Sequence, residues 1–228
     1  MDDNVLTGLL PNDEQYIQKC EEYMKYLEEH KTRVFTAYER FFKNRIRNIV
    51  YHIYSNYIEM YRTYELMLEE AVRKHDESKY SDEEFNPYRI KYYPTDKEKD
   101  LMANNVEKAE YAEELFQDAW HHHCTINQHH PEFYIWNEKT DEGWKVLDQP
   151  SNEPLSMDIV HIMEMLCDWA ASSKGRDDFN YINWWLSHKS DDEHKAMTFE
   201  TKNIVKIITS MILPSEFNLE KDNPRWLE

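Results

Sequence analysis

The stretch EQYIQKCEEYMKYLEE, residues 14–29, indicates through its apolar spacing which kind of fold this chain adopts. Its apolar side chains recur at intervals of three and four residues, at Tyr16, Ile17, Cys20, Tyr23, Met24 and Leu27. That spacing places them on one face of an α-helix, with charged residues on the other. Helix signals continue beyond it, and the 228 residues include only 3 Gly and 8 Pro. The sequence therefore predicts an all-α fold.

Further helices are expected over residues 32–74 (with one break near 45–48), 96–123, 156–172, 178–188 and 199–213. Capping-box spacing marks three helix starts: Asn12 with Gln15, Ser81 with Glu84, and Thr95 with Glu98. A loop is expected over 87–94, and a long loop or short hairpin over 131–154. We predict a single-domain helical bundle with an N-terminal helical extension (1–45), a core (46–190), and a C-terminal helix with a tail (191–228).

The composition of the chain indicates which binding partners and which cellular compartment to expect. A formal net charge of −18 argues against binding to a nucleic-acid polymer and otherwise serves solubility. Three widely spaced cysteines, an odd number without a C-x-x-C pair, indicate reduced thiols. We see no signal peptide near Met1 and no apolar run long enough to span a bilayer. We therefore expect a cytoplasmic protein without a membrane partner; its Met-rich helix faces would permit a homo-oligomer.

A scattered series of His and Asp residues indicates a divalent-metal centre. In chain order it comprises His52, the adjacent pair His75-Asp76, the segment HHHCTINQHHPE (121–132) and Asp168. Histidine is the commonest metal ligand, and carboxylates complete sites for hard or borderline cations. A structural role for the His-Asp pair is the alternative. The series predicts a divalent transition metal (Mn, Fe, Co, Ni or Zn), bound as one or two ions.

Two local patterns support this series. Along a helix over 157–169, His161, Glu164 and Asp168 share one face, which is either solvated or a site that neutralises buried carboxylates. The segment 121–130 holds five His, with Asn127 expected to end a helix and Pro131 to prevent its resumption. Its plain interpretation is surface His at a helix end, which suits the helix dipole.

The order His, His-Asp with Lys three residues after the Asp, His, His-His, Asp resembles the HD superfamily of metal-dependent phosphohydrolases, which are all-helical. This resemblance implies one metal held by His52, His75, Asp76 and Asp168. It implies that Asp76 bridges to a second metal, whose other ligands are His122, His129 and His130. Asp76 and Lys79 would be the catalytic residues, with Asp76 positioning the attacking hydroxide and Lys79 approaching the phosphate. The supporting or substrate-contacting residues would be His123, Asn127, Glu132, Glu164 and Arg89.

Plainer roles remain open for two of these cations: Lys79 could pair with Glu83 or Glu84, and Arg89 could be a solvated residue. The pieces H-D-E-S-K-Y (75–80), A-W-H-H-H-C-T-I-N-Q-H-H (119–130) and M-D…E-M-L-C-D-W (157–169) also resemble an uncharacterised bacterial and phage family. That resemblance covers roughly residues 50–172 and brings no established activity. The chain lacks the Gly-Tyr-Pro segment of the cyclic-dinucleotide branch of the HD superfamily, so that substrate is not carried over.

The function we expect is hydrolysis of a small phosphorylated ligand: a nucleotide, a cyclic nucleotide or a nucleotide-derived signal. If the protein is phage-encoded, it would act in the host cytoplasm. The alternative is a non-catalytic, metal-containing binding protein that sequesters a nucleotide signal or blocks a host protein. Several ligands spread over two ions leave coordination positions open, as catalytic sites require. This favours the enzyme.

Overall fold

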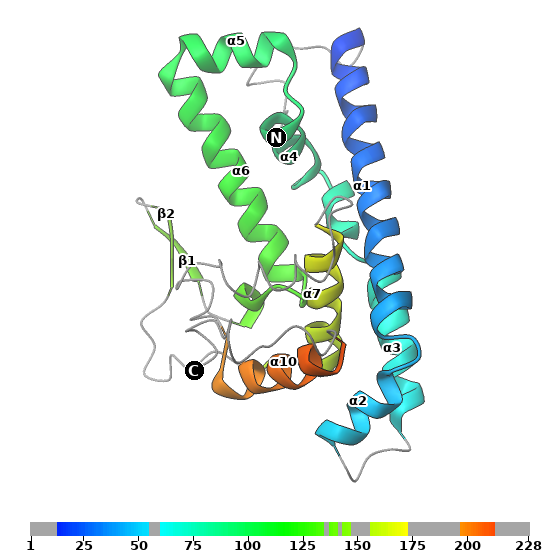
Figure 1. Cartoon of the computed structure of the whole chain (residues 1–228). Helices are drawn as coiled ribbons and strands as arrows, with labels where there is room; N and C mark the ends of the chain where they lie inside the picture. Colours follow the sequence, from blue (N-terminus) through cyan, green and yellow to red (C-terminus); the bar gives the residue numbers. More distant parts are fainter. Residues whose placement is uncertain are drawn as a thin grey trace. The chain divides into compact units, whose positions relative to one another are not determined.

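The computed structural model describes residues 13–54, 60–134, 137–140, 143–146, 156–172 and 197–212. Over these residues the fold is all-α apart from one short hairpin, as the sequence predicted (Figure 1). The chain divides into two compact units, each built from two separate stretches. Unit 1 comprises Met1–Glu29 and Asp76–Asn127, and unit 2 comprises His30–His75 and Gln128–Glu228. This division differs from the sequence-based boundaries after residues 45 and 190.

Helix α1 (Glu14–Phe41) contributes residues to both units as one continuous helix. The sequence analysis had expected separate helices over 14–29 and from 32, but the residues between, His30 and Lys31, include no Gly or Pro to stop the helix. The expected break near residue 45 is confirmed, because a turn over 42–45 separates α1 from α2 (Ile46–Ile53). Helix α3 (Tyr61–Arg73) follows.

Unit 1 consists of the first part of α1, the short 3-10 helix η3 (Glu77–Tyr80), and α4 (Phe85–Tyr92), α5 (Asp96–Asn104) and α6 (Val106–Ile126). Helices α4 and α5 both pack on α6, and Figure 1 shows α5 crossing its first turns. One core cluster joins α1, α4 and α6 through Tyr23, Leu27, Tyr88 and Ala119. A second joins Ile90 to Ala112.

Two sequence-based predictions in unit 1 were wrong. Residues 87–94 are mostly helical, because Pro87 falls in the first turn of α4, where its missing N–H costs no hydrogen bond. The helix expected over 96–123 is two helices, since Asn105 adopts an extended backbone and its side chain caps α6. The capping box of Thr95 and Glu98 at the start of α5 is confirmed. Residue 12 of the Asn12–Gln15 box lies outside the described residues; Asp13 accepts from the Gln15 N–H.

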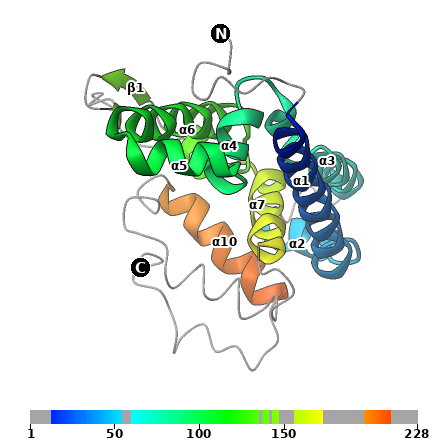
Figure 2. The same cartoon turned by 90° about the horizontal axis from the view of Figure 1, so that it is seen from above.

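Unit 2 is centred on α7 (Ile159–Ala171), which packs against α3 and against α10 (Phe199–Ile212) (Figure 2). Most of α7 is buried, as expected of a helix that is apolar on nearly every side. Together with apolar residues of α1, α2, α3 and α10, it forms one large hydrophobic core. The helices expected over 156–172 and 199–213 are therefore confirmed, whereas that over 178–188 lies outside the described residues.

The insertion before α7 contains the short helix η4 (Pro131–Tyr134) and an antiparallel hairpin of β1 (Asn137–Thr140) and β2 (Gly143–Val146). A short hairpin was one of the two structures expected over 131–154. Among the residues described, no helix has both the length and the apolar character needed to cross a bilayer.

Candidate metal centre

Unit 2 gathers three histidines and two carboxylates from four places in the chain. Helix α3 ends at Arg73, so that His75 follows its C-cap, Lys74. Helix α7 carries Glu164 and Asp168 one turn apart, on the face that the sequence predicted. His129 lies in the turn after α6, and His30 lies on α1. All of these side chains are buried except that of Asp168, which is 19% exposed.

The distances within this group suit metal coordination. His75, His129 and Asp168 each offer one ligand atom, and these atoms all lie within 4.8 Å of one another. His75 Nε2 lies 3.5 Å from Asp168 Oδ1, and His75 Nδ1 lies 3.1 Å from Glu164 Oε1. The ring centroids of His75 and His129 are 4.3 Å apart. These three residues could hold one divalent ion.

Glu164 and His30 also contact that group. Glu164 Oε1 also faces His129 Nδ1 at 3.4 Å, so one carboxylate orients two imidazoles. His30 Nε2 lies 3.0 Å from Asp168 Oδ1. Imidazole ligands commonly use their second nitrogen to contact such a carboxylate, which fixes the ring.

Both carboxylates of α7 are held ionised. Burial raises the pKa of Glu164, but hydrogen bonds from His129, His161 and His75 outweigh it and leave the pKa far below its ordinary value. Burial likewise opposes ionisation of Asp168, and contacts with His30 and His75 bring its pKa well below the ordinary value. The imidazole contacts thus favour the ionised carboxylates, which is the form that binds a cation.

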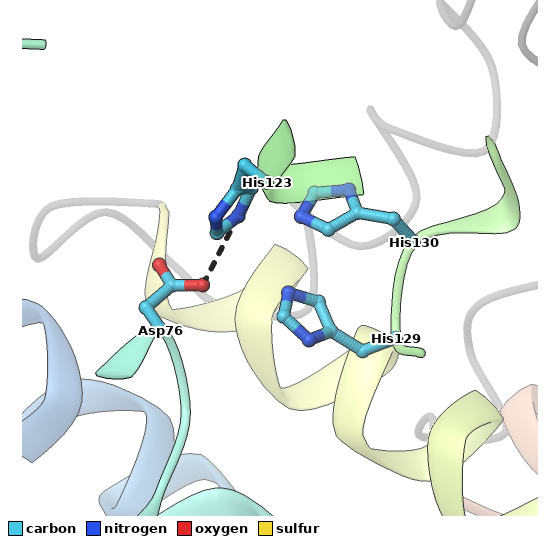
Figure 3. Close-up of side chains that lie close together, drawn as sticks. All are labelled: Asp76, His123, His129 and His130. Carbon is cyan, nitrogen blue, oxygen red and sulfur yellow. Dashed lines mark ion pairs between the residues drawn. The ribbon is translucent and has the colours of Figure 1, made fainter. Parts of the chain in front are cut away.

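Unit 1 holds the second group, which begins at Asp76, the residue after His75. Asp76 adopts a left-handed backbone conformation (φ 57°), and is the one non-Gly residue with positive φ among those described. Its Oδ2 accepts a hydrogen bond of 2.6 Å from the Lys79 ammonium, and its Oδ1 lies 3.3 Å from His123 Nε2. Figure 3 marks the latter ion pair. Lys79 therefore pairs with Asp76.

Glu84, fully buried, organises the rest of this group. Its two oxygens face His122 Nδ1 at 2.8 Å and His123 Nδ1 at 2.9 Å, and Ser78 donates to it at 3.0 Å. Burial raises the pKa of Glu84, but the contacts with His123 and His122 lower it below the ordinary value. The expected capping box of Ser81 and Glu84 is wrong, because this carboxylate is engaged by imidazoles instead.

Two of the sequence-based site residues, His52 and Arg89, lie apart from both groups, and a third, His122, has another partner than expected. His52 is exposed on α2, because Ile46, Ile49 and Val50 occupy the buried face of that helix. His122 meets Glu84, and its neighbour His123 is the one that faces Asp76. Arg89 is buried and forms a two-bond ion pair with Glu98, so it is neither a substrate contact nor a solvated residue.

The remaining predicted residues have local roles. Asn127 ends α6, and its side chain donates to Ser78 Oγ at 2.8 Å and to the His123 carbonyl at 2.8 Å. His130 Nδ1 and Glu132 Oε2 are 3.9 Å apart. Figure 3 shows His129 and His130 as successive side chains, and their ring centroids are 4.3 Å apart.

Sequence reasoning missed His30 as a contact of the centre and gave Glu84 the wrong role. A signal existed for His30: it continues the apolar spacing Tyr23, Leu27, His30, Val34, so a titratable side chain stands on the buried face of α1. For Glu84 no comparable signal existed, because its spacing from Ser81 fits a capping box equally well.

Among known protein families, one matches residues 19–211, and it is described as a family of unknown function (DUF5662). Comparison with curated proteins and with solved structures gave no match. The family match brings no activity or ligand with it. Because it spans well over half of the 228 residues, this chain belongs to the DUF5662 family.

Proposed function

We propose that this protein is a metal-dependent phosphohydrolase that acts on a nucleotide, a cyclic nucleotide or a nucleotide-derived signal. The observation that carries the proposal is the convergence of ligand atoms from His75, His129 and Asp168 within 4.8 Å. A set of two imidazoles and one carboxylate suits Mn, Fe, Co, Ni or Zn. It also leaves coordination positions for water and substrate, as catalytic sites require.

The charge balance of unit 2 supports a cation. Contacts with His30, His75, His129 and His161 lower the pKa values of Glu164 and Asp168, and both carboxylates lie on α7, most of which is buried. Imidazoles must be neutral to bind a metal, and the two carboxylates would then need another positive charge, because an unbalanced buried carboxylate costs several kcal/mol. A divalent ion held by His75, His129 and Asp168 removes that cost and leaves Glu164 to orient the two imidazoles.

The residues that follow His75 support the proposal that the substrate is a phosphate ester. A bound divalent ion would supply a water of lowered pKa and polarise a phosphoryl oxygen. Asp76 is linked to His75 by a single peptide bond, and its carboxylate is held by Lys79 and His123. The Lys79 ammonium supplies positive charge beside that carboxylate, a kind of charge that favours a phosphoryl group. The nucleotide part of the proposal rests on the resemblance to the HD superfamily.

Metal content is the first test, measured by elemental analysis of protein purified without a His-tag or chelator. We expect at least one equivalent in the wild type and in His52→Ala, the matched control with an exposed His. His75→Ala and Asp168→Asn should lose the metal while keeping the helical circular dichroism spectrum. Wild-type protein that contains far less than one equivalent would rule out the metal centre.

Activity is the second test, with nucleotides, cyclic mononucleotides, cyclic dinucleotides and bis(p-nitrophenyl) phosphate offered in the presence of Mn²⁺. We expect phosphate-ester hydrolysis by the wild type and His52→Ala, and none by Asp76→Asn or His75→Ala. Tight retention of one nucleotide without turnover would replace the hydrolase with a sequestering protein. Metal-loaded protein that neither hydrolyses nor binds any of these compounds would refute the proposal.

A further inference from the structure

A cavity of about 330 Å³ lies between α1 and α3 in unit 2, and the proposed reaction does not use it. Its volume is in the range of small-ligand sites, which begin near roughly 300 Å³. Val72 is buried at its base, Lys31 and Phe35 are half-buried, and Thr32, Thr36 and Arg73 are exposed at its rim. The cavity is therefore an open depression that combines apolar side chains (Phe35, Val72) with polar and cationic ones.

Two cations line the cavity in a chain with a formal net charge of −18, and one of them, Arg73, is paired with Glu69. Both of its charged lining residues, Lys31 and Arg73, are cations. The Arg73 guanidinium lies 4.4 Å from the centroid of the Phe35 ring. Its Nε and Nη2 both donate to a single oxygen of Glu69, at 3.1 and 2.6 Å. A guanidinium over a ring forms a flat surface suited to stacking and to recognition of an anion.

We propose that this cavity binds a small organic anion in which a phosphate or carboxylate is attached to a flat apolar ring. The ring lies against Phe35 and Val72. The anionic group is bound by Lys31 and Arg73, with the Thr32 and Thr36 hydroxyls within the same mouth. Such a ligand combines apolar burial with charge-assisted hydrogen bonds, which are stronger than neutral ones.

The two walls of the cavity also carry residues of the candidate metal centre. Lys31 follows His30 on α1, and Arg73 precedes His75 by two residues at the end of α3. His30 and Lys31 differ by about 100° in direction on α1, and His75 lies two residues beyond the last residue of α3, so the cavity and the centre are neighbours along the chain that share no lining residue. An occupant that touches both helices fixes the spacing of His30 and His75, whose ring centroids are 5.4 Å apart. The cavity is thus an effector site, a consequence that rests on the proposed function.

Binding is tested on metal-free protein, dialysed against EDTA, by calorimetric titration with phenyl phosphate. We expect saturable one-to-one binding that Lys31→Ala and Arg73→Ala each weaken about tenfold. Glu69→Gln should tighten it, because the competing carboxylate is removed. Lys74→Ala is the matched control: Lys74 is one residue from Arg73, pairs with Glu70 and does not line the cavity. Equal affinity in all five proteins, or no saturable binding, would overturn the site.

Coupling is tested by titrating Co²⁺ and following its visible absorption, with and without phenyl phosphate. Allosteric coupling is typically at least about fivefold in affinity, so we expect tighter Co²⁺ binding in the wild type and a much smaller change in Arg73→Ala. An identical change in both proteins would refute the effector role. If Co²⁺ did not bind at all, the metal centre would fail, whereas the calorimetric result on metal-free protein would still decide the anion site.

Discussion

Glu84 illustrates how a fully buried carboxylate is kept ionised inside a helical protein. It lies at the N-cap of α4, yet its oxygens contact the two imidazoles of α6 and the Ser78 hydroxyl. This arrangement fixes the ring of His123 so that its Nε2 faces Asp76. One residue thereby sets the geometry of the whole unit 1 group.

Replacement of that carboxylate by an amide should be costly. In Glu84→Gln one amide oxygen can still accept from an imidazole, but the NH₂ group offers a donor where an acceptor is needed. We expect the free energy of unfolding to fall by about 2 kcal/mol, the scale of a buried hydrogen bond to a charged group. Glu83→Gln, at the exposed neighbour, should change it by less than about 0.5 kcal/mol. Denaturant unfolding measures both, and equal effects would contradict the role of Glu84.

The backbone of Asp76 permits a second test at a single residue. Its positive φ is tolerated by Asp, Asn and Gly but disfavoured for Ala. Asp76→Ala and Asp76→Gly both remove the carboxylate, so the difference between them isolates the backbone conformation. We expect the Gly variant to be more stable by about 1 kcal/mol in denaturant unfolding. A more stable Ala variant would mean that this segment does not keep the left-handed conformation.

At the scale of elements, α5 depends on its first residues. Thr95 Oγ1 accepts a hydrogen bond from the Glu98 N–H, and Glu98 Oε2 accepts one from the Thr95 N–H, which completes the capping box. Thr95→Ala should lower the free energy of unfolding by about 1 kcal/mol, the usual cost of losing an N-cap. Thr63→Ala, exposed in the first turn of α3 but not at its N-cap, serves as the control and should be near neutral. Thermal or denaturant unfolding distinguishes them.

The buried ion pair of Arg89 and Glu98 ties α4 to α5 and should make stability depend on pH. Burial raises the pKa of Glu98, but Arg89 and Thr95 lower it below its ordinary value of 4.5. Its stabilisation is therefore complete above that value and is lost as the pH falls through the lower folded-state pKa. Glu98→Gln should cost about 3 kcal/mol at pH 7, and this difference from the wild type should shrink in acid.

The control for that pair is Glu113→Gln, which removes an exposed partner of Lys91 and should cost less than about 1 kcal/mol. Denaturant unfolding of the three proteins at neutral and acidic pH gives the comparison. A Glu98→Gln deficit that stayed constant down to acidic pH would show that the lost stabilisation is not ionic.

At the scale of the whole molecule, the proposed ion would link parts of the chain that are far apart in sequence. His75 follows α3, His129 follows α6, and Asp168 lies on α7. A free ion concentration of about 100 times the Kd stabilises the folded state by about 2.7 kcal/mol. For a chain of this size that raises the Tm by roughly 5–10 °C. EDTA should lower the Tm of the wild type and of His52→Ala and leave that of His75→Ala unchanged. Equal responses in all three would contradict the proposed ligand set.

The sequence alone determined the helical class, most helix positions and the residue types of the candidate centre. These features are local: apolar spacing identifies the buried face of a helix, and capping residues such as Thr95 mark its start. The pairing of Asp168 with His75 was also anticipated, because both belong to the His and Asp series.

Only the tertiary structure decided which of the candidate site residues contact one another. His30 rather than His52 contacts Asp168, because the turn at 42–45 redirects the chain and the apolar residues of α2 take its buried face. His123 rather than His122 faces Asp76, because the rotation of α6 about its axis is set by packing on α4 and α5. Such choices depend on contacts between distant segments, which local spacing does not encode.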